Sequence, residues 1–342
     1  GLLQLNGAGM TGFLKELSPT TIHDINAIVA LYRPGPMEVI PQYIERKRDP
    51  RLISYPDVRM KKYLEESYGL IVYQDDLLFS AIELAGYSWL EADKFRKAVG
   101  KKIPEEMAAQ KEKLMDGIIK NGQTKEFAER LWKLFEPFQA YGFNKAHAAS
   151  YGKVAYQTAY MKANFPVEYM TAVLTAESGD IDKVAEIIAE CKRMSILVLP
   201  PDLNESFSDF TIVDSDGVGG IRFGLSSIKN FGECISEFII KERETNGPFA
   251  SLPDFLSRID SRNLNKKSLE SLIKCGALDR YLERGHMLAN IDTLLEYHKE
   301  ASHSSEHQDS LFGAMTSGPA PLTLTPSPEA TPQDRLAWEK EL

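Results

Sequence analysis

The sequence YGFNKAHAASYGKVAYQT, at residues 141–158, decides much of the predicted fold of this 342-residue chain. It combines a glycine, which permits a tight turn, with a run that predicts a helix from about Ala148 to Ala163. Pro166 closes that helix, because proline cannot continue the helical hydrogen-bond ladder. The helix ends a region, residues 57–165, that is predicted to be mostly helical.

The residues at the start of this helix suit an anion. Asn144, Lys145 and His147 lie just before it or in its first turn, where backbone N–H groups and the positive end of the helix dipole point outward. Lys145 adds a point charge for a triphosphate, and His147 can donate a hydrogen bond to phosphate. The alternative is an ordinary capped helix with a surface lysine.

The region before the turn predicts further helices. The segment GLIVYQDD, residues 69–76, is short and apolar and predicts buried chain leading into a helix over Asp75–Ala85. Ser88 followed by Glu91 is a capping-box pattern for a helix over residues 86–102. Other helices are predicted to open at Pro104, to lie near 124–138, and to occupy 167–194 with Asp180 as a cap.

The first residues predict a strand at Leu2–Leu5 and a helix that starts after a cap at Ser18–Pro19. YRPGPM, residues 32–37, then forms a rigid turn that presents Tyr32 and Arg33, because its prolines and glycine cannot continue a helix. An arginine on such a turn loses little entropy when it binds a phosphate. A purely structural turn with an exposed arginine is the alternative.

Basic residues concentrate in the middle of an acidic chain. The net charge is −9, yet residues 92–165 carry 14 basic and 8 acidic side chains, a local net charge of +6. A basic region between acidic flanks suits a phosphate-binding surface and sequence-neutral DNA contacts. A solvated helical face is the alternative. The basic run consists of Lys94, Arg96, Lys97, Lys101 and Lys102.

Near Leu197 the pattern changes to short strands with glycine turns, and we place a domain boundary near 195–205. Residues 224–249 then predict two helices joined by a tight turn, and 263–279 predict a second such element. Hairpins of this kind expose backbone N–H groups that hold a DNA phosphate without reading bases, although ordinary helical packing is the alternative. The candidate DNA contacts are Lys229, Asn230, Gly232, Lys266 and Lys267.

From residue 301 the chain is rich in Ser, Pro, Thr and Gly and predicts a flexible linker before a helix that begins near Asp334. Within it, QDSLFG at 308–313 places Leu311 and Phe312 in a polar tract. An exposed apolar pair in a flexible segment favours a peptide that docks into a partner's pocket. Packing of the pair against its own domain is the alternative.

The three cysteines, Cys191, Cys234 and Cys275, are far apart and odd in number. This pattern disfavours a disulfide framework or a zinc site and indicates small buried residues in a reducing cytoplasm. No apolar run approaches the ~20 residues of a membrane span, so no membrane partner is expected. The chain also has no phosphate loop of the GxxxxGK type.

Together these segments resemble the alpha subunit family of bacterial DNA polymerase III, the C-family replicative polymerases. The resemblance covers essentially all of the chain, and its motifs occur in the family's order and spacing. The most specific motifs are ALYRPGP (30–36), ISYPD (53–57), YGLIVYQ (68–74), KAVGKK (97–102), YGFNKAHAASY (141–151), LPPDLN (199–204) and SLESLIKCGALD (268–279).

The resemblance implies a mainly α fold, in which a multi-helix fingers domain precedes a small α/β region with tandem helix–hairpin–helix elements. The implied divisions are the end of the palm (1–27), the fingers (28–195), a clamp-binding region (196–300) with hairpins at 224–279, a flexible linker with a clamp peptide (301–333) and the start of a helix (334–342).

The resemblance also implies a DNA-directed DNA polymerase, a nucleotidyltransferase that uses Mg²⁺ ions held by palm aspartates. Its implied partners are a DNA primer–template, deoxynucleoside triphosphates, the sliding clamp and other replicase subunits. The implied nucleotide-binding residues are Arg33, Asn144, Lys145 and His147, and the implied clamp-binding residues are Gln308, Leu311 and Phe312.

The palm aspartates, and hence the Mg²⁺ ligands, are expected outside these 342 residues, so we expect the chain alone to be inactive. The start without Met, inside a strand-like run, indicates a piece of a longer protein. One alternative is a stand-alone, non-catalytic module that binds DNA and the sliding clamp. Another is a helix–hairpin–helix enzyme such as a repair glycosylase, for which we find no catalytic Lys or Asp against the hairpin.

Overall fold

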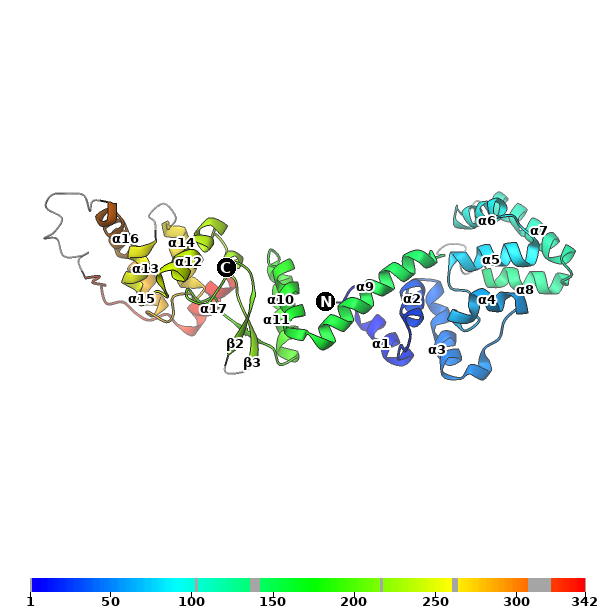
Figure 1. Cartoon of the computed structure of the whole chain (residues 1–342), viewed down its shortest axis with the longest axis horizontal. Coiled ribbons are helices and arrows are strands. Elements are labelled where there is room, and N and C mark those ends of the chain that lie inside the picture. The colour runs from blue at the N-terminus through cyan, green and yellow to red at the C-terminus, as the bar shows by residue number, and fades with distance from the viewer. Residues whose placement is uncertain are drawn as a thin grey trace. The chain divides into compact units, whose positions relative to one another are not determined.

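The computed structural model describes residues 2–101, 104–135, 142–215, 218–259, 264–306 and 321–341. The chain divides into two compact units, Gly1–Ala163 and Asn164–Leu342. Helices make up most of the described residues, and a three-stranded sheet lies in the second unit (Figure 1). The prediction of a mainly α fold with a small α/β region is therefore confirmed.

The first unit is helical throughout its regular structure, apart from one isolated β-bridge among the described residues. Its α-helices are α1 (Ala8–Leu17), α2 (Ile22–Leu31), α3 (Ile40–Arg48), α4 (Lys61–Leu64), α5 (Gln74–Ala85), α6 (Trp89–Lys101), α7 (Pro104–Lys120), α8 (Lys125–Phe135) and α9 (Lys145–Asn164). Its 3-10 helices are η1 (Pro36–Val39), η2 (Pro50–Leu52), η3 (Val58–Met60) and η4 (Glu65–Ser67).

Two apolar cores hold this unit together. One lies among α5, α6, α7 and α8, where the ring of Phe95 packs 6.4 Å from that of Trp132 and 6.3 Å from that of Phe135. The other surrounds α2, which is buried along nearly its whole length. In this second core, Gly152 of α9 packs closely against α2, because a Cβ there would lie 2.0 Å from Oδ1 of Asn26 on α2.

A buried carboxylate fixes the start of α2. Asp24 accepts hydrogen bonds from the backbone N–H of Thr20 (2.9 Å) and from the hydroxyls of Tyr43 (3.2 Å) and Tyr68 (3.0 Å). The Lys47 ammonium lies 3.1 Å away. Burial acts to raise the pKa of Asp24, but these bonds outweigh it and hold the pKa below its ordinary value.

The N-terminal segment differs from the prediction. Leu2–Leu5 forms no strand, and Leu5 is buried in the core around α2 instead. Helix α1 was not predicted; it ends at Ser18 in a left-handed conformation, with φ 45°. Thr21 caps α2 in a capping box with Asp24, so the expected cap at Ser18–Pro19 was wrong. An apolar run without a partner strand gains no ladder hydrogen bonds, which explains the missing strand.

Other helix boundaries follow local chemistry more closely. The Ser88 capping box is confirmed, because its N–H and hydroxyl both donate to Glu91 (2.9 and 2.8 Å). Asp180 caps its helix as predicted. However, α9 begins at Lys145 rather than near Ala148, and Pro166 opens the next helix. Proline is favourable there because the first turn has no partner for its missing N–H.

The second unit places a small sheet beside short helices. Strands β1 (Leu197–Leu199), β2 (Thr211–Ser215) and β3 (Val218–Arg222) lie in the order β1-β3-β2, with β1 parallel and β2 antiparallel to β3. The predicted strands after Leu197 are thus confirmed. The helices are α10 (Pro166–Ala176), α11 (Ile181–Arg193), η6 (Leu225–Ser227), α12 (Glu233–Asn246), α13 (Leu252–Arg258), α14 (Lys266–Lys274), α15 (Arg284–Ala289), α16 (Ile291–Glu306) and α17 (Pro332–Glu341).

The described part of the expected linker, 301–333, is held in place. Residues 301–306 continue α16, and Leu322 and Leu324 pack against the core formed by α12, α13, α14 and α16. Thr325 and Asn290 exchange two hydrogen bonds, of 2.8 and 3.0 Å. The last helix begins at Pro332, two residues before the predicted start.

Cys191 and Cys275 are buried as predicted, whereas Cys234 in the first turn of α12 is exposed, so that part of the cysteine prediction was wrong. Among the residues that the structure describes, no helix is both long enough and apolar enough to span a bilayer.

Candidate nucleotide-binding and DNA-binding surfaces

Helices α5 and α9 start side by side (Figure 1). Tyr73 and Phe143, the residues just before these starts, form a parallel β-bridge, and the Gln74 N–H donates to the Phe143 carbonyl at 2.9 Å. The Lys145 N–H donates to Oδ2 of Asp75 at 2.8 Å. Gly142 permits this approach, since a Cβ there would lie 2.5 Å from Cγ of Gln74. Two helix N-termini therefore meet at one turn.

Asp76 holds the α5 side of this junction. Its buried carboxylate accepts the backbone N–H groups of Val72 and Tyr73, each at 2.8 Å, and burial raises its pKa to about 7. Asp76 thereby caps the start of α5 through the Val72 and Tyr73 N–H groups. Asp75 instead fixes the start of α9.

The predicted residues Asn144 and His147 lie at the first turn of α9. Oδ1 of Asn144 accepts the His147 N–H at 2.9 Å, so Asn144 caps the helix. The His147 ring lies 5.0 Å from the ring of Phe143 and 4.2 Å from that of Tyr151. His147 is nevertheless exposed to solvent, although its ring lies near those of Phe143 and Tyr151.

Arg33 reaches the same turn from the segment after α2. Its guanidinium carbon lies 3.7 Å from the ring centroid of Phe143, a cation–π contact that orients the charge. Burial lowers the pKa of Arg33, but a guanidinium stays protonated at neutral pH. The sequence did not identify Phe143 as the residue that joins Arg33 to the turn.

Lys145 carries an ion pair that the sequence also did not predict. Its Nζ lies 2.8 Å from Oε2 of Glu66 in η4, and 5.8 Å from the ring centroid of Tyr73. The hydrogen bond from Lys145 holds the pKa of Glu66 below its ordinary value. The structure thus brings together all four predicted nucleotide-binding residues, with Glu66 as an acidic neighbour.

The basic run on α6 is partly paired. Arg96 and Lys97 lie 2.8 and 2.6 Å from the carboxylate of Asp93, and these two cations lower the pKa of Asp93. Arg96 also lies 3.4 Å from Oε1 of Gln74, which places it near the start of α5. Lys94 is exposed. The side chain of Lys101 and all of Lys102 lie outside the described residues.

In the first predicted hairpin the expected first helix is only the 3-10 turn η6, and the second helix, α12, has an open start. Asn230 adopts a left-handed conformation, with φ 63°, and Gly232 caps α12 without a side-chain hydrogen bond. The first N–H groups of α12 therefore have no side-chain cap, as an anion-binding turn requires. Lys229 donates to the Glu341 carbonyl at 3.1 Å.

The second predicted hairpin, at 263–279, has one helix, α14, among its described residues rather than the two expected, and its polar groups are more fully paired. Asn265 caps α14 in a capping box with Ser268, and Lys266 lies 2.6 Å from the carboxylate of Asp292. Lys267 is exposed. The candidate clamp contacts Gln308, Leu311 and Phe312 lie outside the described residues.

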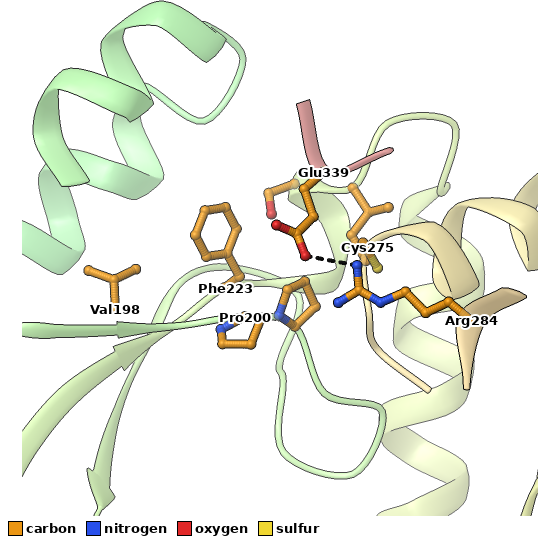
Figure 2. A pocket seen from close by; sticks show the side chains of 9 residues that line it. Val198, Pro200, Phe223, Cys275, Arg284 and Glu339 are labelled. Atoms are coloured by element: carbon orange, nitrogen blue, oxygen red, sulfur yellow. Dashed lines mark hydrogen bonds and ion pairs between the residues drawn. The ribbon is translucent and has the colours of Figure 1, made fainter. Parts of the chain in front are cut away.

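The second unit also contains a cavity of about 410 Å³ beside β1 (Figure 2). Its walls include Pro200, Phe223 and Cys275, and Arg284 points into it toward Glu339 of α17, at 2.8 Å. Burial raises the pKa of the Cys275 thiol to about 12, which disfavours its thiolate form. The cavity therefore offers apolar walls, a buried thiol and an arginine paired with Glu339.

Comparisons with known proteins identify both regions. A family model described as the bacterial DNA polymerase III alpha subunit finger domain matches residues 1–122, and a helix-hairpin-helix motif model matches residues 195–287. The chain is 44% identical over 349 residues to the DNA polymerase III subunit alpha of Thermus aquaticus, covering 100% of this chain. The chain belongs to the DNA polymerase III alpha subunit family. Alpha subunits of Borreliella burgdorferi and Vibrio cholerae are 43% and 40% identical over 92% and 99% of the chain.

The chain spans about 28% of the length of the Thermus alpha subunit, and 27% and 30% of the other two. Within the alpha subunit family, the finger match covers α1 to α7, and the helix-hairpin-helix match runs from β1 into α15. The resemblance inferred from the motifs is thus confirmed. The finer domain divisions remain predictions.

Proposed function

We propose that this chain supplies the nucleotide-binding and DNA-holding surfaces of a replicative DNA polymerase. The observation that carries the proposal is the junction of α5 and α9, where Arg33, Asn144, Lys145 and His147 gather around Phe143. These residues surround a helix N-terminus, whose dipole favours a phosphate, although the Lys145 and His147 N–H groups are already bonded to Asp75 and Asn144. Two cations beside such a start suit the several charges of a triphosphate.

The hairpin at Lys229–Gly232 is proposed to hold the DNA backbone. Its uncapped helix start provides N–H donors for a phosphate, which would fix the duplex without reading its sequence. Lys94, Arg96 and Lys97 on α6, and Lys266 and Lys267 on α14, are proposed as further backbone contacts. Gln308, Leu311 and Phe312 are proposed to bind the sliding clamp.

Mg²⁺ is proposed to act in the whole polymerase through ligands outside this chain. Among the described residues, no group of three or more His, Cys, Asp or Glu side chains could hold a metal ion. The proposed role of this chain is therefore to bind and orient the triphosphate and the DNA.

The test of the nucleotide site is mutation in the full-length polymerase. Arg33→Ala and Lys145→Ala should each weaken nucleotide binding by roughly 10- to 150-fold, because each removes a charge-assisted phosphate contact worth roughly 1.5–3 kcal/mol. Binding is measured as the Kd for the incoming nucleotide in a ternary complex with primer–template. Lys153→Ala, an exposed lysine farther along α9, is the matched control. Unchanged nucleotide affinity in both site variants would refute the proposed role.

A further inference from the structure

Glu66 is an acidic neighbour of the proposed nucleotide site, as is Asp75, which accepts the Lys145 N–H. Glu66 lies in η4, and the chain turns sharply after it, with φ 54° at Tyr68 and 79° at Gly69. Oε2 of Glu66 lies 2.8 Å from Nζ of Lys145 on α9. The pair joins residues 79 positions apart in the sequence and leaves 46% of the Glu66 side chain and 39% of the Lys145 side chain exposed.

We propose that Glu66 is the resident counterion of Lys145, which the triphosphate of an incoming nucleotide displaces. The inference rests on the proposed function, because it assigns to Glu66 a role at the site of Lys145. Glu66 then weakens the binding of every anion at the start of α9, so that ligands with several charges are preferred there.

The physical argument is competition for one cation. The lowered pKa of Glu66 keeps it ionised at neutral pH, so its carboxylate occupies Lys145 in the absence of nucleotide. An exposed pair of this kind contributes little to stability and can open readily. A phosphate group that binds Lys145 is also repelled by the negative charge of Glu66. The several charged groups of a triphosphate offset this repulsion better than the one group of inorganic phosphate does.

A second partner for Glu66 is already in place. Nδ1 of His23, on α2, lies 3.4 Å from the same Oε2 atom. His23 can donate a hydrogen bond to Glu66 once Lys145 turns toward a ligand. The carboxylate therefore does not need to leave the site when the nucleotide binds.

The experiment measures binding of deoxyadenosine triphosphate and of inorganic phosphate to the 342-residue chain by titration calorimetry, at fixed ionic strength. Glu66→Gln should bind the triphosphate about two- to five-fold more tightly than wild type, the range expected for loss of an exposed ion pair. It should bind inorganic phosphate more tightly by at least the same factor. Glu65→Gln, in the same 3-10 turn, removes the same charge from a residue for which the described structure records no ion pair, and should change neither affinity.

A double-mutant cycle with Lys145→Ala separates the inference from the proposed function. If Glu66 acts through Lys145, Glu66→Gln has no effect in the Lys145→Ala background. Equal affinities of Glu66→Gln and wild type, with Lys145→Ala weakened, overturn the counterion role and leave the nucleotide site intact. An equal gain in Glu65→Gln also overturns it, because net charge alone then explains the effect. Lys145→Ala with wild-type affinity, or no measurable binding by any variant, counts against both proposals.

Discussion

At the scale of single residues, two helix contacts in the first unit depend on glycines that lack a Cβ atom. Gly142 lets α5 and α9 start together, and Gly152 lets α9 approach α2. Neither glycine has a positive φ, so close packing rather than backbone conformation requires them. This requirement is a property of the folded chain and has no local sequence pattern.

Gly152→Ala should therefore destabilise the chain despite the better helix propensity of alanine. Its Cβ would meet Oδ1 of Asn26 at 2.0 Å, and relief of such a clash costs roughly 1–3 kcal/mol. The free energy of unfolding in urea measures the effect. Gly12→Ala is the matched control, because Gly12 is exposed within α1 and nothing lies within 4 Å of its added Cβ. That variant should be more stable by about 0.5–1 kcal/mol. Equal behaviour of the two variants would contradict the packing argument.

Residue contacts also mark the limit of sequence reasoning at the site. Arg33, Asn144, Lys145 and His147 were predicted from a stiff turn, a helix start and a family resemblance, and the structure places them around one turn. Phe143 and Glu66 were missed, because their contacts with Arg33 and Lys145 join residues far apart in the chain. The acidic pair Glu65–Glu66 precedes an apolar run, and this local pattern does not indicate which distant lysine Glu66 will contact.

At the scale of elements, the first hairpin presents a helix start that no side chain caps. Lys229→Ala should weaken DNA binding about equally for all sequences and reduce the slope of log K against log salt by about 1. Fluorescence titrations with duplexes of unrelated sequence, at several salt concentrations, measure both quantities. Lys241→Ala, exposed on the same helix α12, should leave the slope unchanged. A slope that is the same in all three proteins would show that Lys229 contacts no phosphate.

The candidate clamp peptide makes a separate prediction. Leu311→Ala combined with Phe312→Ala should abolish binding to the sliding clamp, because it removes both apolar anchors of the proposed peptide. The melting temperature should stay within about 1 °C of wild type, since we expect the pair to lie in a flexible linker, where substitutions rarely cost more than about 0.5 kcal/mol. Surface plasmon resonance on immobilised clamp and a thermal melt provide the two readouts. A large drop in melting temperature would favour packing of the pair against its own domain.

Elements with local signals were the most predictable. The Ser88 capping box, Asp180 and the strands after Leu197 follow from short patterns, and the structure contains all of them. Helix α1 was missed because its sequence AGMTGFLKEL contains two glycines and starts without a side-chain cap. Tertiary contact also decides the conformation of Leu2–Leu5: in the described part of the chain no strand pairs with it, and Leu5 joins a helical core.

At the scale of the whole molecule, the family and the helical fold were within reach of the sequence, because many motifs occur in a fixed order. The chain nevertheless spans less than a third of the matched alpha subunits. We predict that the isolated 342-residue chain gives no primer extension with Mg²⁺ and all four nucleotides, because the palm aspartates are expected outside it. A gel-based extension assay with a full-length polymerase as positive control measures this. Templated, Mg²⁺-dependent extension by the chain alone would contradict the prediction.

The shared start of α5 and α9 has a mechanical consequence. Lys145 is tied through its own N–H to Asp75, and Phe143 is bridged to Tyr73, so a force on the turn acts directly on α5. Helix α5 in turn anchors the core that contains Phe95 and α8. A displacement of Lys145 would therefore be transmitted through the turn to α5 and to the apolar core that α5 shares with α6, α7 and α8.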